Sequence, residues 1–177
     1  MSSVPADGPL LVVMAGRPGT GKTTLAGRIA TTLRAAYLRI DAIETAIVRS
    51  GLATPPVGPV GYVVAQEVAA GTLAAGVSVV ADAVNPVPEA RAGWRELGAR
   101  TRTPIVVFET RIADEEEHRR RVTARTPDLA GLVVPSWEQV MAAEYVAWDD
   151  LRDGPRHVID MTDTAAGVRA ALDVLGR

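Results

Sequence analysis

One segment near the start of the chain, Gly16 to Thr23, has the residue types and spacing of a loop that binds phosphate groups. It reads Gly-Arg-Pro-Gly-Thr-Gly-Lys-Thr and matches the pattern G-x-x-x-x-G-K-[ST] in full. Glycines allow the backbone to curl so that successive N–H groups face a phosphate. We predict that this P-loop and the residue after it bind a nucleoside triphosphate through Gly16, Arg17, Pro18, Gly19, Thr20, Gly21, Lys22, Thr23 and Thr24.

Lys22 and Thr23 have separate expected roles. Lys22 would act in catalysis by reaching the β and γ phosphates, and the Thr23 hydroxyl would ligate the Mg²⁺ that bridges them. A glycine-rich turn without a nucleotide is the alternative, but the strand-like run before the loop and the helical pattern after it argue against that reading. Because the chain has no Asn-Lys-x-Asp guanine signature, we expect ATP and not a regulatory GTPase, although the P-loop itself does not decide between ATP and GTP.

Two aspartates follow apolar runs that have the character of strands. Asp41 follows 36–40, and a carboxylate there can accept the proton of a hydroxyl acceptor, so we predict that Asp41 is the general base. The alternative is an N-cap for the next helix, which the same residue could also provide. Asp82 follows 77–81 and is predicted to hold the Mg²⁺ through a water molecule. Its alternative role is to start a turn before Pro86.

A charged helix predicted over 114–126 carries two further candidates. Arg121 and Arg125 precede a proline-bounded loop, and an arginine there could neutralise the transferring phosphate as a lid at about 119–136 closes. Glutamates placed four residues before arginines stabilise a helix and explain the same run equally well. Whether other side chains line an acceptor pocket is left open; those considered are Asn85, Arg91, Trp137, Tyr145 and Trp148, with Arg91 expected on a helix surface and the aromatics in the core.

The elements that must position these residues alternate along the chain. Strands are predicted over 10–15, 36–40, 77–81, 104–108 and 156–159, and helices over 24–33, 42–49, 60–75, 89–99, 114–126, from 136 onward and over 164–175. Such alternation is typical of an α/β fold of three layers with a five-stranded parallel sheet. Ligands bind at the carboxyl ends of parallel strands, so we expect the P-loop, Asp41, Asp82 and Glu109 along one edge.

Composition limits the classes of partner and compartment. The chain of 177 residues has a net charge of −2, without the basic clusters typical of nucleic-acid binders. It has no cysteine, and neither a signal peptide nor a membrane-spanning run is evident. We expect a flexible leader at 1–9, one domain over 10–177, a cytoplasmic location without membrane contact, and a small-molecule partner; the sequence does not decide between monomer and homodimer.

These motifs resemble those of small AAA-type P-loop kinases, a group that includes chloramphenicol phosphotransferase, gluconate and adenylylsulfate kinases, and the kinase domain of polynucleotide kinase. The resemblance covers most of the chain and rests on 16–26, 39–41, 79–85 and 121–125. It implies a fold like that of nucleoside monophosphate kinases with a small lid, a catalytic base at Asp41, and lid arginines at Arg121 and Arg125.

The chain also departs from this group at two points. Polynucleotide kinases usually have Thr-Asn after the third-strand aspartate, where this chain has Ala83 and Val84 before Asn85. The arginine that grips an acceptor phosphate in nucleoside monophosphate kinases has no convincing counterpart, and Arg49 is the only candidate in the second helix. Both departures favour an uncharged acceptor over a nucleic acid.

The leading hypothesis is therefore an ATP- and Mg²⁺-dependent kinase, an enzyme that moves the γ-phosphate to a hydroxyl of a small molecule. The alternatives are a kinase acting on the 5′-hydroxyl of a polynucleotide, and a nucleotide-binding regulator without kinase activity that signals through its lid.

Overall fold

The computed structural model describes residues 8–177, so the leader expected at 1–9 falls almost entirely outside the described residues. Five strands form one sheet in the order β2-β3-β1-β4-β5, and every neighbouring pair is parallel. The strands are β1 (Leu11–Ala15), β2 (Ala36–Arg39), β3 (Val79–Asp82), β4 (Ile105–Arg111) and β5 (His157–Asp160). The predicted five-stranded parallel sheet of an α/β fold is confirmed.

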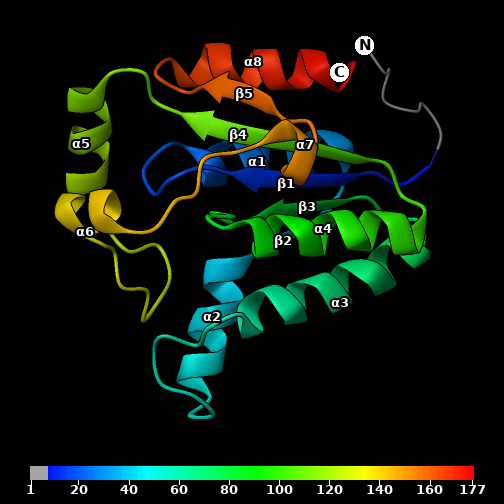
Figure 1. Ribbon diagram of the computed structural model, residues 1–177, viewed down its shortest axis with the longest axis horizontal. Helices are drawn as coiled ribbons and strands as arrows, with labels where there is room; N and C mark the ends of the chain where they lie inside the picture. The colour runs from blue at the N-terminus through cyan, green and yellow to red at the C-terminus, as the bar shows by residue number, and fades with distance from the viewer. Residues whose placement is uncertain (1–7) are drawn as a thin grey trace.

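Helices cover both faces of this sheet (Figure 1). They are α1 (Lys22–Leu33), α2 (Ile40–Arg49), α3 (Val60–Ala74), α4 (Pro88–Thr101), α5 (Glu115–Thr123), α6 (Trp137–Ala142), α7 (Asp150–Asp153) and α8 (Thr164–Val174). Helices α1 and α8 pack on one face, and α3 and α4 on the other. Helices α5 and α6 lie beyond the carboxyl ends of the strands. No helix in the described part of the chain is long and apolar enough to cross a membrane.

Alternation of side chains along the strands builds a core on each face. In β1, Val12 and Met14 point toward α1 and α8, whereas Leu11 and Val13 point toward α3 and α4. All four are buried because the sheet is covered on both sides, which is why this strand reads as a continuous apolar run. Two packed layers fix the sheet, and the fixed sheet sets where its carboxyl edge lies.

Several element boundaries differ from those predicted. Helix α2 begins at Ile40, directly after Arg39, so Asp41 lies in the first turn of the helix and does not cap it. Strand β4 continues to Arg111 and contains Glu109, which was expected to follow the strand. Helix α5 ends at Thr123, before Arg125. In each case the propensity pattern was right and the end of the element was set by tertiary packing.

The aromatic residues after Ser136 do not share one helix. Ser136 and Gln139 form the predicted capping box, but α6 ends at Ala142, so the spacing of Trp137, Tyr145 and Trp148 is not helical. The unpredicted helix α7 follows this segment. Its last residue, Asp153, is bound through its side chain by an arginine of α4.

Arg91 is a buried structural residue and not the surface residue expected. Its guanidinium donates to Asp153 at 2.8 Å, and both side chains are 1% exposed. It also donates to the carbonyls of Asn85, Pro86 and Val146, and it lies over the Trp148 ring. One side chain thus joins α4 to the loop after β3 and to the segment that leads into α7.

Arg91→Met leaves the buried Asp153 with Arg152 as its remaining charged partner and leaves three carbonyls without their donor, so it should lower the free energy of unfolding by about 3 kcal/mol. Arg100, also on α4, forms an exposed ion pair with Glu67 of α3, and Arg100→Met should cost less than about 1 kcal/mol. Urea unfolding of both variants measures the difference. Equal, small losses would contradict the structural role of Arg91.

Candidate active site

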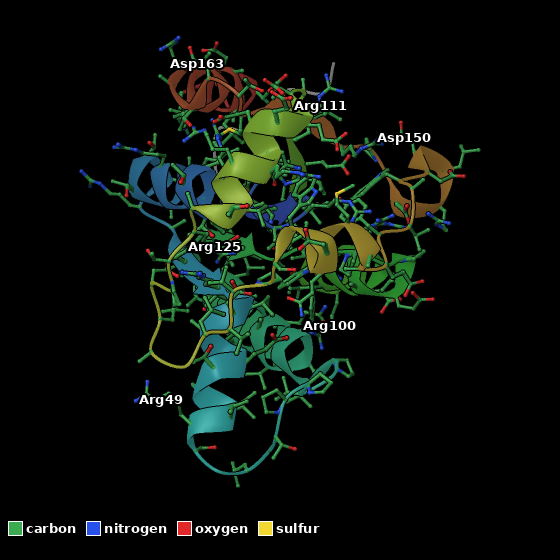
Figure 2. All side chains as sticks on the ribbon, turned by 90° about the vertical axis from the view of Figure 1, so that its left-hand side faces the viewer. Arg49, Arg100, Arg111, Arg125, Asp150 and Asp163 are labelled. Atoms are coloured by element: carbon green, nitrogen blue, oxygen red, sulfur yellow. The ribbon has the colours of Figure 1, made fainter. Side chains whose placement is uncertain are left out.

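The carboxyl edge of the sheet opens into a cavity of about 510 Å³. Figure 2 looks toward this edge, with Arg125 labelled near its centre. The lining residues come from the P-loop and the start of α1, from the first turn of α2, from the end of β3 and the loop after it, from α5 and the segment between α5 and α6, and from the start of α8. They are Pro18, Gly19, Gly21, Lys22, Thr23, Thr24, Asp41, Asp82, Ala83, Val84, Arg121, Arg125, Thr126, Asp128, Leu132, Val133, Pro135 and Thr164. Most of the predicted site residues therefore meet in one place.

The P-loop wraps the N-terminus of α1 in a conformation that requires glycine. Gly21 precedes the helix with a φ of 92°, in the left-handed region. A Cβ atom on Gly19 would lie 2.5 Å from Val122, and one on Gly16 would lie 2.4 Å from the carbonyl oxygen of Thr110. Free N–H groups at the start of a helix attract anions. The loop thus fits the triphosphate of a nucleotide.

Lys22 carries the positive charge that lies deepest in the loop. Its side chain donates to the carbonyl of Arg17 at 2.8 Å, and the residue is 8% exposed. Burial lowers the pKa of Lys22 to about 8, against the opposing influence of Asp82 and Asp41. A buried ammonium with few partners gains strongly from an anionic ligand.

Asp82 ends β3 and is held by a tyrosine that the sequence analysis did not consider. Tyr37, on β2, donates its hydroxyl to Oδ2 of Asp82 at 2.7 Å. Burial and the neighbouring Asp82 raise the pKa of Tyr37, so it remains a donor at neutral pH. The tyrosine therefore fixes the rotation of a carboxylate that is 4% exposed.

Thr23 and Asp82 both line the cavity and fit the predicted magnesium site. A hydroxyl and a carboxylate are oxygen donors, which Mg²⁺ prefers, and Mg²⁺ usually keeps waters and phosphate oxygens as its other ligands. Within residues 8–177, no group of three or more His, Cys, Asp or Glu side chains is arranged so that it could hold a metal ion.

Asp41, the predicted base, lies between two arginines. Its Oδ2 is 3.3 Å from Arg39 and 3.7 Å from Arg125, and the side chain is 39% exposed. Asp41 thus faces the cavity within reach of two guanidinium groups.

Arg39 also binds a residue of the predicted lid. It donates to Oδ2 and Oδ1 of Asp128 at 2.5 and 3.0 Å. Asp128 lies in the loop between α5 and α6, so this ion pair ties the loop to the end of β2. The loop then covers the cavity with Leu132, Val133 and Pro135.

Arg121 lines the cavity from α5 but is fully engaged with protein groups. It donates to Glu117 at 2.6 Å and to the carbonyls of Met161 and Thr162 at 2.8 Å. The predicted Glu-to-Arg spacing is thus realised at Glu117. A role for Arg121 in charge neutralisation requires it to leave these carbonyls.

Helix α5 also contacts the P-loop itself. The Nε2 atom of His118 lies 2.8 Å from the carbonyl oxygen of Pro18, and the His118 ring meets Trp137 edge-on. Val122 packs against Gly19. A shift of α5 would therefore move the backbone of the P-loop.

Some predicted residues lie outside the cavity. Arg17 turns away to donate to the carbonyls of Val140 and Ala143, and Thr20 hydrogen-bonds to Thr110 behind the loop. Glu109 binds Tyr145 and Arg156 and does not join the edge cluster as expected.

The open candidates for an acceptor pocket also lie elsewhere. Asn85 is 1% exposed and bonds to Met14 and Trp94, so its role is structural. None of the residues considered for an acceptor pocket lines the cavity. These residues are Asn85, Arg91, Trp137, Tyr145 and Trp148.

Tyr37 and Asp128 were not predicted as site residues, and Arg39 was part of the 39–41 motif but had no predicted role. The available signal was position: Arg39 stands two residues before Asp41, and Tyr37 is two residues earlier on the same face of β2. No local signal identifies Asp128, because its pairing with Arg39 joins residues 89 positions apart.

The buried lysine predicts how stability depends on pH. Between the pKa of about 8 in the fold and its ordinary value of 10.5, the unfolded chain binds more protons, so the free energy of unfolding rises with pH. From about pH 7.5 to about pH 9.5 the nucleotide-free wild type should gain about 2 kcal/mol relative to Lys22→Met. Urea unfolding at each pH tests this, and parallel pH curves would contradict it.

Comparisons with solved structures identify the fold. A sugar kinase from Janibacter sp. HTCC2649 is 19% identical, with a TM-score of 0.70 and coverage of 95% of each chain. Kti12 from Chaetomium thermophilum, in complex with ADP-AlF3, is 19% identical with a TM-score of 0.68 over 92% of this chain and 95% of that one. The APS kinase CysC of Mycobacterium tuberculosis, in complex with AMPPNP and APS, is 16% identical with a TM-score of 0.66 over 97% and 99%.

These similarities confirm the three-layer α/β fold and the predicted resemblance to P-loop kinases. No curated protein sequence matches the chain. A family model described as "AAA domain", AAA_33, matches residues 11–143, which hold the P-loop, both aspartates and the lid segment. The chain therefore belongs to the AAA_33 family of P-loop proteins.

Proposed function

We propose that the protein is a kinase that uses ATP and Mg²⁺ to phosphorylate a hydroxyl group of a small molecule. The observation that carries this proposal is that Asp41 lines the same cavity as Lys22 and the P-loop. A carboxylate facing the phosphate site can accept the proton of a hydroxyl that attacks the γ-phosphate. A nucleotide-binding protein without an acceptor has no chemical need of such a group.

The residues divide the reaction between them. The P-loop amides and Lys22 hold the phosphates and stabilise the charge that develops during transfer. Thr23 and, through a water molecule, Asp82 would hold Mg²⁺, which would supply positive charge to neutralise the phosphates. Asp41 orients the acceptor hydroxyl and takes its proton. Arg125, 3.7 Å from Asp41, would face the transferred phosphate, and Arg121 also lines the cavity.

Two features support a small acceptor over a polynucleotide. The cavity is closed on one side by the segment 126–135, and the chain carries a net charge of −2. A groove for a nucleic acid backbone would be lined by unpaired cations, whereas the arginines here are paired with Asp41, Asp128 and Glu117.

A regulator is the second candidate, and the contact of α5 with the P-loop favours it. Through His118 and Val122, the presence of a phosphate could move the lid segment and alter a binding surface. Kti12, one of the similar structures, is described in complex with ADP-AlF3. Asp41 separates the two candidates, because a regulator does not need a base.

Incubation with γ-labelled ATP, Mg²⁺ and a metabolite extract should transfer label to a small molecule. Asp41→Asn should reduce that transfer by at least about a hundredfold, because it removes the base, while the affinity for ATP changes by less than about threefold. Lys22→Ala is the control that loses transfer together with ATP affinity. Full transfer by Asp41→Asn would exclude the assigned base, and ATP binding without any transfer would favour the regulator.

Tyr37→Phe should raise the Mg²⁺ concentration needed for tight ATP binding by about tenfold, because Asp82 loses the group that orients it. Binding of ADP in the presence of EDTA should be unchanged. A fluorescent nucleotide titrated at several Mg²⁺ concentrations measures both. Tyr62→Phe, which loses a tyrosine hydroxyl bonded to the Asn85 backbone, is the control; the same Mg²⁺ dependence in both variants would rule out a specific role for Tyr37.

A further inference from the structure

Arg39 is a buried cation beside the proposed base, and it is held by a carboxylate from outside its own element. The residue is 8% exposed, and its Nε atom is buried without a hydrogen-bond partner among the described residues. Both of its terminal nitrogens bind Asp128, and one also reaches Asp41. The planar fork of an arginine matches the two oxygens of a carboxylate.

A second cation, Arg125, lines the cavity, whereas Arg39 lies behind the lining residues Asp41 and Asp128 that it binds. Arg125 is 26% exposed and lies 3.7 Å from Asp41. Its charge, after the larger contribution of Arg39, helps to keep the pKa of Asp128 below its usual value. Arg39 of β2 and Arg125 and Asp128 of the lid segment therefore lie together next to Asp41, the proposed base.

Of these partners, Asp128 is the one that can be exchanged at low cost. Its side chain is 53% exposed and lies in a segment without helix or strand, so released Asp128 is readily hydrated. Arg39 is anchored in β2, in register with Asp82, and cannot follow. Breaking the pair leaves a buried guanidinium, which requires another anion in the same place.

We propose that the acceptor carries a carboxylate that replaces Asp128 on Arg39, with Arg125 nearby, so that the substrate is a small hydroxy acid. Held there, the acceptor would present a neighbouring hydroxyl to Asp41. The assignment of the substrate class rests on the proposed function, whereas the anion site itself does not.

This inference reverses the sequence-based expectation of an uncharged acceptor. That expectation depended on Arg49 as the only candidate for an acceptor-binding arginine. Arg49 lies at the end of α2, away from Arg125 at the centre of Figure 2, and does not line the cavity. Arg39, ten residues earlier, provides the buried arginine.

The competing explanation is that the Arg39–Asp128 pair is only a structural latch for the loop. The two explanations predict opposite effects of removing Asp128. If Asp128 competes with a ligand carboxylate, Asp128→Asn binds such a ligand more tightly. If Asp128 only fastens the loop, the variant disorders the cavity wall and binds less tightly.

Calorimetry on protein loaded with Mg²⁺ and AMPPNP tests binding without phosphoryl transfer. Two pairs of probes differ in a carboxylate: gluconate is compared with sorbitol, and glycerate with glycerol. Glycerol 3-phosphate tests whether a phosphate binds in place of the carboxylate. At least one carboxylate should bind the wild type about tenfold more tightly than its matched alcohol. Asp128→Asn should bind it several times more tightly still, and Arg39→Gln should bind it about ten to a hundredfold more weakly.

Glu116→Gln makes the same charge change at an exposed position on α5 and should leave binding as in the wild type. Arg39→Lys keeps the charge but loses the fork, and should recover only part of the affinity. Thermal melts with AMPPNP confirm that each variant is folded and loaded.

Equal binding of the alcohols, no binding by any carboxylate, or no gain in Asp128→Asn would each overturn the proposal. Tighter binding of glycerol 3-phosphate than of both carboxylates would overturn the carboxylate assignment in favour of a phosphate. Selective carboxylate binding without any phosphoryl transfer would refute the proposed function alone. Transfer to alcohols only would refute this inference alone.

Discussion

The parallel direction of all five strands is the constraint on which the rest of the structure depends. In a parallel sheet every strand ends at the same edge, so residues far apart in sequence meet there without any local signal. The order β2-β3-β1 places Lys22, after β1, and Asp41, after β2, on either side of Asp82, at the end of β3. The cavity follows from the topology, and the side chains at these three ends give it its chemistry.

Charge balance is the second feature of this cavity. Its lining contains three cationic and three anionic side chains, namely Lys22, Arg121, Arg125, Asp41, Asp82 and Asp128, with Arg39 buried behind them. Each arginine is paired within the protein, whereas Lys22 relies on a carbonyl and on more distant carboxylates. A triphosphate therefore satisfies Lys22 first, and any further anion must displace a carboxylate. The nucleotide and the acceptor therefore bind to different charged groups of one site.

The sequence predicted the elements and the nucleotide side of the site well, because both depend on local patterns. The P-loop is a contiguous motif, and continuous apolar runs such as 10–15 identify strands buried on both faces. The acceptor side was predicted poorly. Tyr37, Arg39 and Asp128 act through contacts with distant residues, and Arg91 is buried only because Asp153 arrives from 62 positions away. Local sequence propensities carry no information on such long-range pairings. For the same reason, the ends of α5 and β4 differ from those predicted.

If one cavity holds both the nucleotide and the acceptor, the acceptor hydroxyl lies between Asp41 and the γ-phosphate. A crystal structure with Mg²⁺ and AMPPNP would show this arrangement. In it we expect Lys22 to leave the Arg17 carbonyl for the β and γ phosphates, and Asp41 to face the γ-phosphate across a gap of about two hydrogen bonds, roughly 5 to 6 Å. A nucleotide bound elsewhere, or a γ-phosphate shielded from Asp41 by protein, would contradict this expectation.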